Sequence, residues 1–388
     1  CLVGSEMCIR DRCRRPMTLR VVKIGTSLLR ERPGASTAEA ISTLSASLAE
    51  CISAGDRLVL VSSGAVGLGC QRLGMERRPV NLTGLQAAAA IGQGYLMSLY
   101  EEALARHSIP VAQVLLTRAD LADRRRYRSA SATLHQLLEW GVLPIVNEND
   151  TVSSVELRFG DNDTLSALVA AAIGADDLIL LTDVASLYSA DPRNDADAQP
   201  ITDVIHPSQI DALEKGAGDG GQWGTGGMTT KLAAARIATA SGITVRLGDG
   251  RQPDALQAML RGGRGGTVFH PHPQPLGNRK SWLAHALRPS GVLTLDDGAC
   301  RALTEKGASL LLVGISDLEG EFDANQAVRL VNAAGEEVAR GLSSMDSAKI
   351  RDQLAKATSD TSHQGGAPVV VHRDAMVLMT PTIRPSAS

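Results

Sequence analysis

The alternation of short apolar runs with longer helical stretches is the feature that most restricts the fold of this chain. Apolar runs such as 57–61, 110–116 and 177–182 are separated by helical segments, and the alternation occurs about seven times between residues 19 and 250. This pattern predicts an α/β domain with a mostly parallel sheet sandwiched by helices, because parallel neighbouring strands require a crossover connection. Ligands of such sheets bind at the carboxyl ends of the strands, where most of the polar clusters of this chain fall.

The pattern changes near residue 262. The stretch "RGGRGGTVFHPHPQPLGNRK" is rich in Gly and Pro and is interpreted as a linker. Beyond it, short strands, a short helix and tight turns predict a small β-rich domain. The expected parts are an α/β domain at 17–270, a linker at 271–289, the β-rich domain at 290–376 and a disordered tail at 377–388.

The first 16 residues, "CLVGSEMCIRDRCRRP", contain three of the six cysteines and have no apolar stretch typical of a secretory signal. We interpret them as a non-native segment that resembles translated sequencing-adapter read-through, with the true start at Met17. The other cysteines, Cys51, Cys70 and Cys300, are scattered without metal-ligand spacing, which favours reduced thiols in a cytoplasmic protein. No apolar run reaches the roughly 18 residues needed to span a bilayer.

Lys23 is unusual because it lies within an apolar run, where a charge is costly unless it is paired. One interpretation is an edge lysine that reaches solvent. The other is anion binding, since Gly25, Thr26 and Ser27 follow directly. The stretch "GTGGMTTK" at 224–231 is likewise either a Gly-rich turn before a helix or a phosphate-binding loop, and its spacing is not that of a Walker A motif.

Two polar clusters, "NEND" at 147–150 and "GDND" at 160–163, lie close together in the sequence. The second lacks the Gly of an EF-hand loop, so a dedicated calcium site is disfavoured. Asp163 alone fits the N-cap of a following helix, but capping leaves the remaining acids and amides unexplained.

Seven stretches occur in one order: "VVKIGTS", "VSSGAVGLG", "LLTRADLADRRRY", "PIVNENDTV", "FGDNDTLSA", "LLTDVASLYSADPR" and "GTGGMTTK". In this order and spacing the chain resembles the glutamate-phosphorylating members of the amino acid kinase family, from about Leu19 onwards. The C-terminal region resembles the PUA domain that these proteins carry. The stretch "PLGNRKSWL" departs from the "ENRKRW" that is usual there, which weakens expectations about interdomain contacts only.

The resemblance implies transfer of the ATP γ-phosphoryl group to the side-chain carboxylate of L-glutamate, the first step of proline biosynthesis. Lys23 and Lys231 would bracket the phosphoryl group, Asp163 would orient both lysines, and Gly25, Thr26 and Gly64 would offer backbone N–H groups. Glutamate would be bound by Ser63, Asp150 and Asn162, with Gly64, Asn147 and Asp161 as neighbours. The nucleotide would contact Lys23, Gly25, Thr182, Asp183, Thr225, Gly226, Gly227, Met228, Thr229, Thr230 and Lys231.

The resemblance also implies Mg²⁺ carried with ATP rather than held by dedicated protein ligands, feedback inhibition by proline, and a homo-oligomer, either a dimer or a tetramer. One alternative is another kinase of this fold, acting on acetylglutamate, aspartate or UMP. A second alternative is RNA binding through the PUA-like region. Residues 291–388 contain nine Lys or Arg against thirteen Asp or Glu, which disfavours RNA and favours a regulatory or structural role. The basic run at 118–128 is interpreted as a solvated helix face, or otherwise as a subunit contact.

Overall fold

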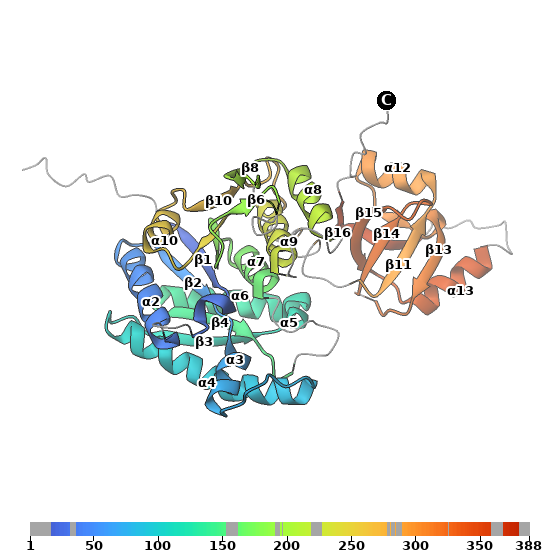
Figure 1. The fold of residues 1–388 in the computed structure, drawn as a ribbon. Helices are drawn as coiled ribbons and strands as arrows, with labels where there is room; N and C mark the ends of the chain where they lie inside the picture. The colour runs from blue at the N-terminus through green and yellow to red at the C-terminus, as the bar shows by residue number, and fades with distance from the viewer. Residues whose placement is uncertain are drawn as a thin grey trace, which may run out of the picture. The chain divides into compact units, whose positions relative to one another are not determined.

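The structure is a computed structural model that describes residues 17–31, 36–152, 162–190, 195, 197–218, 227–277, 280, 284, 289–324, 326–357 and 368–379. Contacts divide the chain into two units (Figure 1). The first contains the described residues of Cys1–Thr117 and Ser129–Pro273. The second contains those of Arg118–Arg128 and Gln274–Ser388.

A single large sheet organises the first unit. Within the described residues it has eight strands in the order β3-β4-β2-β1-β5-β9-β10-β8. All neighbours are parallel except the antiparallel pair β9 and β10, which confirms the prediction of a mostly parallel sheet. The strands are β1 (Leu19–Ile24), β2 (Arg57–Val61), β3 (Val111–Leu116), β4 (Leu143–Glu148), β5 (Asp177–Thr182), β8 (Asp203–Val204), β9 (Thr244–Asp249) and β10 (Gly266–Phe269).

Helices cover both faces of this sheet (Figure 1). On one face, α2 (Thr37–Ser53), α4 (Leu82–Ala105) and α10 (Pro253–Leu260) share a core with Val22 and Ile24 of β1. On the other face lie α7 (Asn162–Ile173), which is buried along its whole length, and α9 (Gly227–Ala240), which contacts α7. Because side chains alternate along a strand, Lys23 faces α7 while its neighbours Val22 and Ile24 face α2 and α4.

The remaining elements of the unit are α1 (Thr26–Leu29), α3 (Ala65–Arg72), α6 (Arg124–Glu139, which begins in the second unit), α8 (Pro207–Gly218), β6 (Leu187–Tyr188) and β7 (Pro200–Ile201). Two glycines bring α3 and α4 into backbone contact. A Cβ atom on Gly69 would lie 1.8 Å from the carbonyl oxygen of Ala88, and one on Gly92 would lie 1.8 Å from that of Ala65. The position of α3 on α4 therefore requires glycine at both places.

The interpretation of 261–280 as a linker is wrong for part of this stretch, because Gly266–Phe269 forms β10 inside the sheet. Thr267, Val268 and Phe269 are buried, and Thr267 Oγ1 donates a hydrogen bond to the carbonyl oxygen of Ile201 at 2.6 Å. Three β-branched or aromatic residues suffice for a strand here because neighbouring strands lie on both sides. Glycines and prolines flank these residues in the sequence, and their number favoured a linker over a strand.

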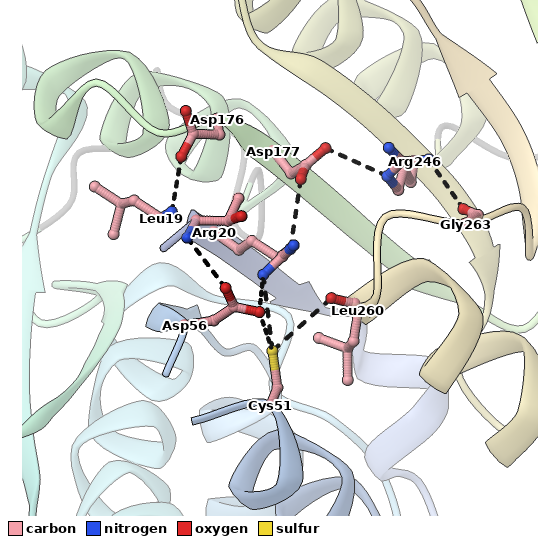
Figure 2. Close-up of polar contacts among 10 residues, drawn as sticks. Leu19, Arg20, Cys51, Asp56, Asp176, Asp177, Arg246, Leu260 and Gly263 are labelled. Carbon is pink, nitrogen blue, oxygen red and sulfur yellow. Dashed lines mark hydrogen bonds and ion pairs between the residues drawn. The ribbon is translucent and has the colours of Figure 1, made fainter. Parts of the chain in front are cut away.

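A buried ion network lies at the amino ends of the strands (Figure 2). Arg20 of β1 is 1% exposed, and its guanidinium contacts Asp56 Oδ2 at 2.5 Å and Asp177 Oδ2 at 3.4 Å. Asp177 also contacts Arg246 Nε at 3.3 Å, and Arg246 donates to the carbonyl oxygen of Gly263 at 2.9 Å. Two arginines and two aspartates thus join β1, β5 and β9 at this edge.

The thiol of Cys51 belongs to the same network and donates to Asp56 Oδ2 at 3.4 Å. Cys51 and Cys70 are buried and Cys300 is partly buried, and all three are free thiols. The described part of the chain contains no helix with the length and hydropathy that a bilayer crossing requires.

The second unit contains the small β-rich domain that the sequence predicts. Its sheet has six strands among the described residues, in the order β12-β16-β15-β14-β11-β13, and only β11 and β14 are parallel neighbours. Its last strand extends two residues beyond the expected boundary at 376. The elements are α5 (Arg118–Ala122), β11 (Gly291–Leu295), α12 (Asp297–Lys306), β12 (Leu310–Leu311), η2 (Leu312–Gly314), β13 (Ile315–Gly320), β14 (Ala327–Val331), β15 (Glu337–Ser343), α13 (Ser347–Ala357) and β16 (Val369–Leu378).

Within the basic run at 118–128, the side chains of Arg124, Arg125 and Arg126 are exposed, and Arg126 NH1 contacts Asp120 Oδ1 at 2.9 Å. These side chains are exposed in the single chain, and the choice between a solvated helix face and a subunit contact stays a prediction.

Candidate active site

The predicted site residues come together at the carboxyl ends of the parallel strands. Lys23 lies near the end of β1, Ser63 follows β2, Asn147 lies at the end of β4, and Thr182 ends β5. Because these four strands are parallel and adjacent, their ends meet at one edge of the sheet. All four side chains are buried.

Asp163 holds two lysines that are far apart in the sequence. Lys23 Nζ lies 2.6 Å from Asp163 Oδ1, and Lys231 Nζ lies 3.3 Å from Asp163 Oδ2. The side chains of Lys23 and Asp163 are each 6% exposed, and that of Lys231 is 11% exposed. Thr230 Oγ1 donates to Asp163 Oδ2 at 2.7 Å. The structure thus brings together the three residues that were expected to be catalytic.

Burial alone would raise the pKa of Asp163, but the charges of Lys23 and Lys231 outweigh it. Hydrogen bonds from Lys23 and Thr230 also lower the pKa of Asp163. The pKa of Asp163 is therefore lowered, and this carboxylate stays ionised at neutral pH. It can hold two ammonium groups side by side despite their mutual repulsion.

Asn162, the residue before Asp163, belongs to a second cluster. Its Nδ2 donates to Ser63 Oγ at 3.1 Å and to Asn147 Oδ1 at 3.2 Å. Asn147 Nδ2 in turn donates to Gln93 Oε1 of α4 at 2.8 Å. At the start of α7, Asn162 thus points to a group of amides and a hydroxyl, and the next residue, Asp163, points to the lysines.

Asp150, expected to bind substrate, lies after the end of β4 beside a cavity of about 340 Å³. The cavity is also lined by Gln93, Gln113 and Glu148. Burial raises the pKa of Asp150 to about 6, the charge of Glu148 adds to this effect, and Arg78 opposes it. An ionised Asp150 is therefore under-compensated, and a cation placed beside it would be stabilised.

The residues expected to contact the nucleotide lie at the end of β5 and at the start of α9. Thr182 Oγ1 donates to Asp183 Oδ1 at 3.2 Å. Burial would raise the pKa of Asp183, but hydrogen bonds from its own backbone, Thr182 and Ser27, together with the charge of Arg251, lower it. Gly227, Met228, Thr229, Thr230 and Lys231 form the first turn of α9 and its next residue, where backbone N–H groups favour anions.

Gly25 and Gly64, both expected to offer backbone N–H groups, lie in different backbone surroundings. The N–H group of Gly25 donates to the carbonyl oxygen of Leu181 at 3.2 Å and extends the contact between β1 and β5, and a nucleotide contact of Gly25 stays a prediction. Gly64 precedes α3 with φ of 98°, a conformation that favours glycine, directly after Ser63. Asp161, Thr225 and Gly226 lie outside the described residues.

Sequence reasoning did not single out Gln93 or Gln113. Gln93 lies within an Ala-rich stretch of α4, more than 50 residues from Asn147, and nothing in its neighbourhood distinguishes it from a surface glutamine. Among the residues that the structure describes, no group of three or more His, Cys, Asp or Glu is placed to hold a metal ion.

Comparison with known proteins shows the family of the chain. Residues 18–249 match the amino acid kinase family and residues 291–363 match the PUA domain. The chain therefore belongs to the amino acid kinase family. It is 65% identical over 362 residues to the glutamate 5-kinase of Synechococcus sp. (strain CC9605), a match that covers 93% of this chain and 99% of that protein.

It is also 66% identical to the glutamate 5-kinase of Parasynechococcus marenigrum (strain WH8102), with the same coverage. Among solved structures, the carbamate kinase from Giardia lamblia bound to AMP-PNP matches with a TM-score of 0.49 and 19% identity. That match covers 66% of this chain and 99% of the carbamate kinase, and its similarity is too low to support an inference about function.

Proposed function

We propose that this chain catalyses the ATP-dependent phosphorylation of the side-chain carboxylate of L-glutamate, giving γ-glutamyl phosphate and ADP. The observation that carries the proposal is the buried Asp163 with its two lysines, adjacent to the Asn162, Ser63 and Asn147 cluster. The relatives that match nearly the full length of the chain support the same activity.

The chemistry needs positive charge more than it needs a base. A glutamate side-chain carboxylate has a pKa of about 4.3 and is already ionised at neutral pH. The main barrier is the approach of this anion to a polyanionic triphosphate. Lys23 and Lys231, held by Asp163, would stabilise the charge on the transferring phosphoryl group in the transition state.

ATP would enter as its Mg²⁺ complex, so the metal is part of the substrate. Thr182, Asp183 and the start of α9 would position the nucleotide, and the N-terminus of α9 would favour its phosphates. Thr225 and Gly226 stay predicted nucleotide contacts, and Asp161 stays a predicted neighbour of glutamate.

Glutamate itself presents an ammonium group and two carboxylates. Asp150 would attract the ammonium group, and Ser63 and Asn162 would bind polar groups at the α-carbon. This division agrees with the burial of Asp150 beside Glu148, which leaves the Asp150 carboxylate without full charge compensation.

The direct test measures ATP turnover by the full chain with L-glutamate, acetylglutamate, aspartate and UMP in parallel. Hydroxylamine would trap an acyl phosphate product as a hydroxamate. We expect turnover and hydroxamate with glutamate alone. Turnover with acetylglutamate, aspartate or UMP in place of glutamate would contradict the proposal and identify the alternative kinase.

We further propose that the reaction is the first step of proline biosynthesis and that proline, a cyclic relative of glutamate, inhibits by competing for its site. Inhibition that glutamate does not relieve would contradict a shared site. A homo-oligomer, either dimer or tetramer, and a cytoplasmic location stay predictions.

For the PUA-like region we propose a regulatory or structural role rather than RNA binding, because its sequence carries more acids than bases. The domain limits proposed above, 17–270 and 290–376, enclose the residues that match the two family models. Salt-dependent binding of RNA to the full chain would overturn the regulatory assignment.

A further inference from the structure

A chain of side-chain amides connects the surface of α4 to Asn162. Gln93 Nε2 donates to Gln113 Oε1 at 3.1 Å, and Gln93 Oε1 accepts from Asn147 Nδ2 at 2.8 Å. Asn147 Oδ1 accepts from Asn162 Nδ2 at 3.2 Å. Each amide therefore faces the next with a donor opposite an acceptor.

The direction of this chain is fixed by a backbone group. The N–H of Glu148 donates to Asn147 Oδ1 at 2.9 Å. A backbone N–H group can only donate, so the atom of Asn147 that faces it must be the oxygen. It follows that Asn147 turns its NH₂ group to Gln93, and that Asn162 must turn its own NH₂ group to Asn147. This removes the usual ambiguity between the oxygen and nitrogen of an amide.

The consequence falls on Asn162. Both hydrogens of its Nδ2 are used, one toward Ser63 and one toward Asn147. Its Oδ1 is buried and has no hydrogen-bond partner among the described residues. A buried carbonyl oxygen without a donor is costly, so this atom is complementary to a ligand that brings N–H groups.

We infer that Gln93 is a positioning residue: through Asn147 it holds the Asn162 carbonyl oxygen toward the α-ammonium group of the amino acid substrate. This inference rests on the proposed function and extends it to a residue that makes no assigned contact with substrate. Ser63 Oγ accepts from Asn162, which leaves its hydroxyl hydrogen to donate to a carboxylate. The pair would then recognise both charges at the α-carbon.

The test compares two ligands and a graded set of variants of the full-length protein. Glutarate has the two carboxylates of glutamate but lacks the ammonium group. Gln93→Met keeps the side-chain length and removes the acceptor for Asn147. We expect it to raise the KM for L-glutamate at least about fivefold, with the Ki of glutarate and the KM for ATP within about twofold of the parent values.

Two control variants separate positioning from a general structural effect. Gln93→Glu keeps an acceptor oxygen opposite Asn147 and should retain most of the affinity for glutamate. Gln136→Met removes an exposed amide of α6 that lies outside this chain of amides and outside the cavity, and it should change the KM for glutamate by no more than about twofold.

Three outcomes would overturn the inference: an unchanged KM for glutamate in Gln93→Met, a parallel rise in the Ki of glutarate, or an equal rise in the KM for glutamate in Gln136→Met. If the parent protein phosphorylates no glutamate, the proposed function fails, and that result is distinct because it appears before any variant is compared.

Discussion

The two ends of β1 carry basic residues in opposite situations. Arg20 and Lys23 are three positions apart on one strand, and both are almost fully buried. At the amino end, the network that contains Arg20 has two arginines and two aspartates, so its charges balance (Figure 2). At the carboxyl end, the ion pairs between described residues join two lysines to one aspartate.

This difference separates a structural cluster from a functional one. A balanced buried network is satisfied by the protein itself, and removing one member leaves an unpaired charge. Two buried lysines that meet at one carboxylate can attract an anion, and phosphate groups are such anions. In the proposed function, the same strand therefore holds the sheet together at one end and a charged substrate at the other.

Substitution of Arg20 is expected to have the largest effect. Arg20→Met would remove the cation beside Asp56 and one of the two cations beside Asp177. Breaking such a buried pair costs about 3 to 5 kcal/mol in the free energy of unfolding. Urea unfolding monitored by circular dichroism measures this loss. Arg246→Met is the matched control and should cost less, because both aspartates keep Arg20. Equal losses in the two variants would contradict a central role for Arg20.

Substitution of Lys231 should lower activity while it leaves the free energy of unfolding almost unchanged, the opposite of the effect expected for Arg20. Lys231→Ala is expected to lower kcat at least about tenfold, or about 1.4 kcal/mol of transition-state stabilisation, with little change in the KM for glutamate. Asp163 keeps Lys23 as its partner, so the urea midpoint should stay near that of the parent. A near-normal kcat would refute the catalytic role of Lys231.

Substitution of Asp150 probes the side of the site that binds the amino acid. Asp150→Ala should raise the KM for glutamate with saturating ATP, because the ammonium group loses a carboxylate beside the cavity. Asp150→Asn keeps the shape and should show a similar rise, since the charge is what matters. If neither variant changes this KM, Asp150 does not contact glutamate.

The pH dependence is expected to be the smallest effect. Because the pKa of Asp150 is raised to about 6, this carboxyl gains a proton as the pH falls through 6 and loses its attraction for an ammonium group. The kcat/KM for glutamate should therefore decrease below pH 6, and Asp150→Asn should remove that step. A step of the same size in the variant would assign the titration to another group.

The lysine cluster is predicted through the family resemblance, which matches Lys23, Asp163 and Lys231 to the family's lysines and aspartate. The residues alone leave Lys23 open between an edge lysine and an anion-binding lysine. The mostly parallel sheet follows from the alternation of apolar runs. The role of Arg20 could not be predicted in the same way, although it interrupts the same strand. Its partners are Asp56, just before β2, and Asp177, the first residue of β5, and these strands become neighbours of β1 only in the folded sheet.

Two further contacts could not be predicted from the sequence, for the same physical reason. Gly25 was expected to offer its N–H group to phosphate, but whether a backbone group is used by a neighbouring strand depends on the register between β1 and β5. Gln93 reaches Asn147 only because α4 packs beside β3 and β4, and a glutamine on an Ala-rich helix carries no local mark of that contact. Both depend on distances between elements, which residue patterns do not specify.

The backbone contact between α3 and α4 has a consequence for the choice of substrate. Ser63 stands just before α3 and Gln93 lies on α4, and the contacts at Gly69 and Gly92 hold these helices together without side chains that could rearrange. Ser63 and Gln93, which contact Asn162 directly and through Asn147, therefore keep a fixed spacing. We expect the site to select its amino acid by fit rather than by adjustment of these two helices.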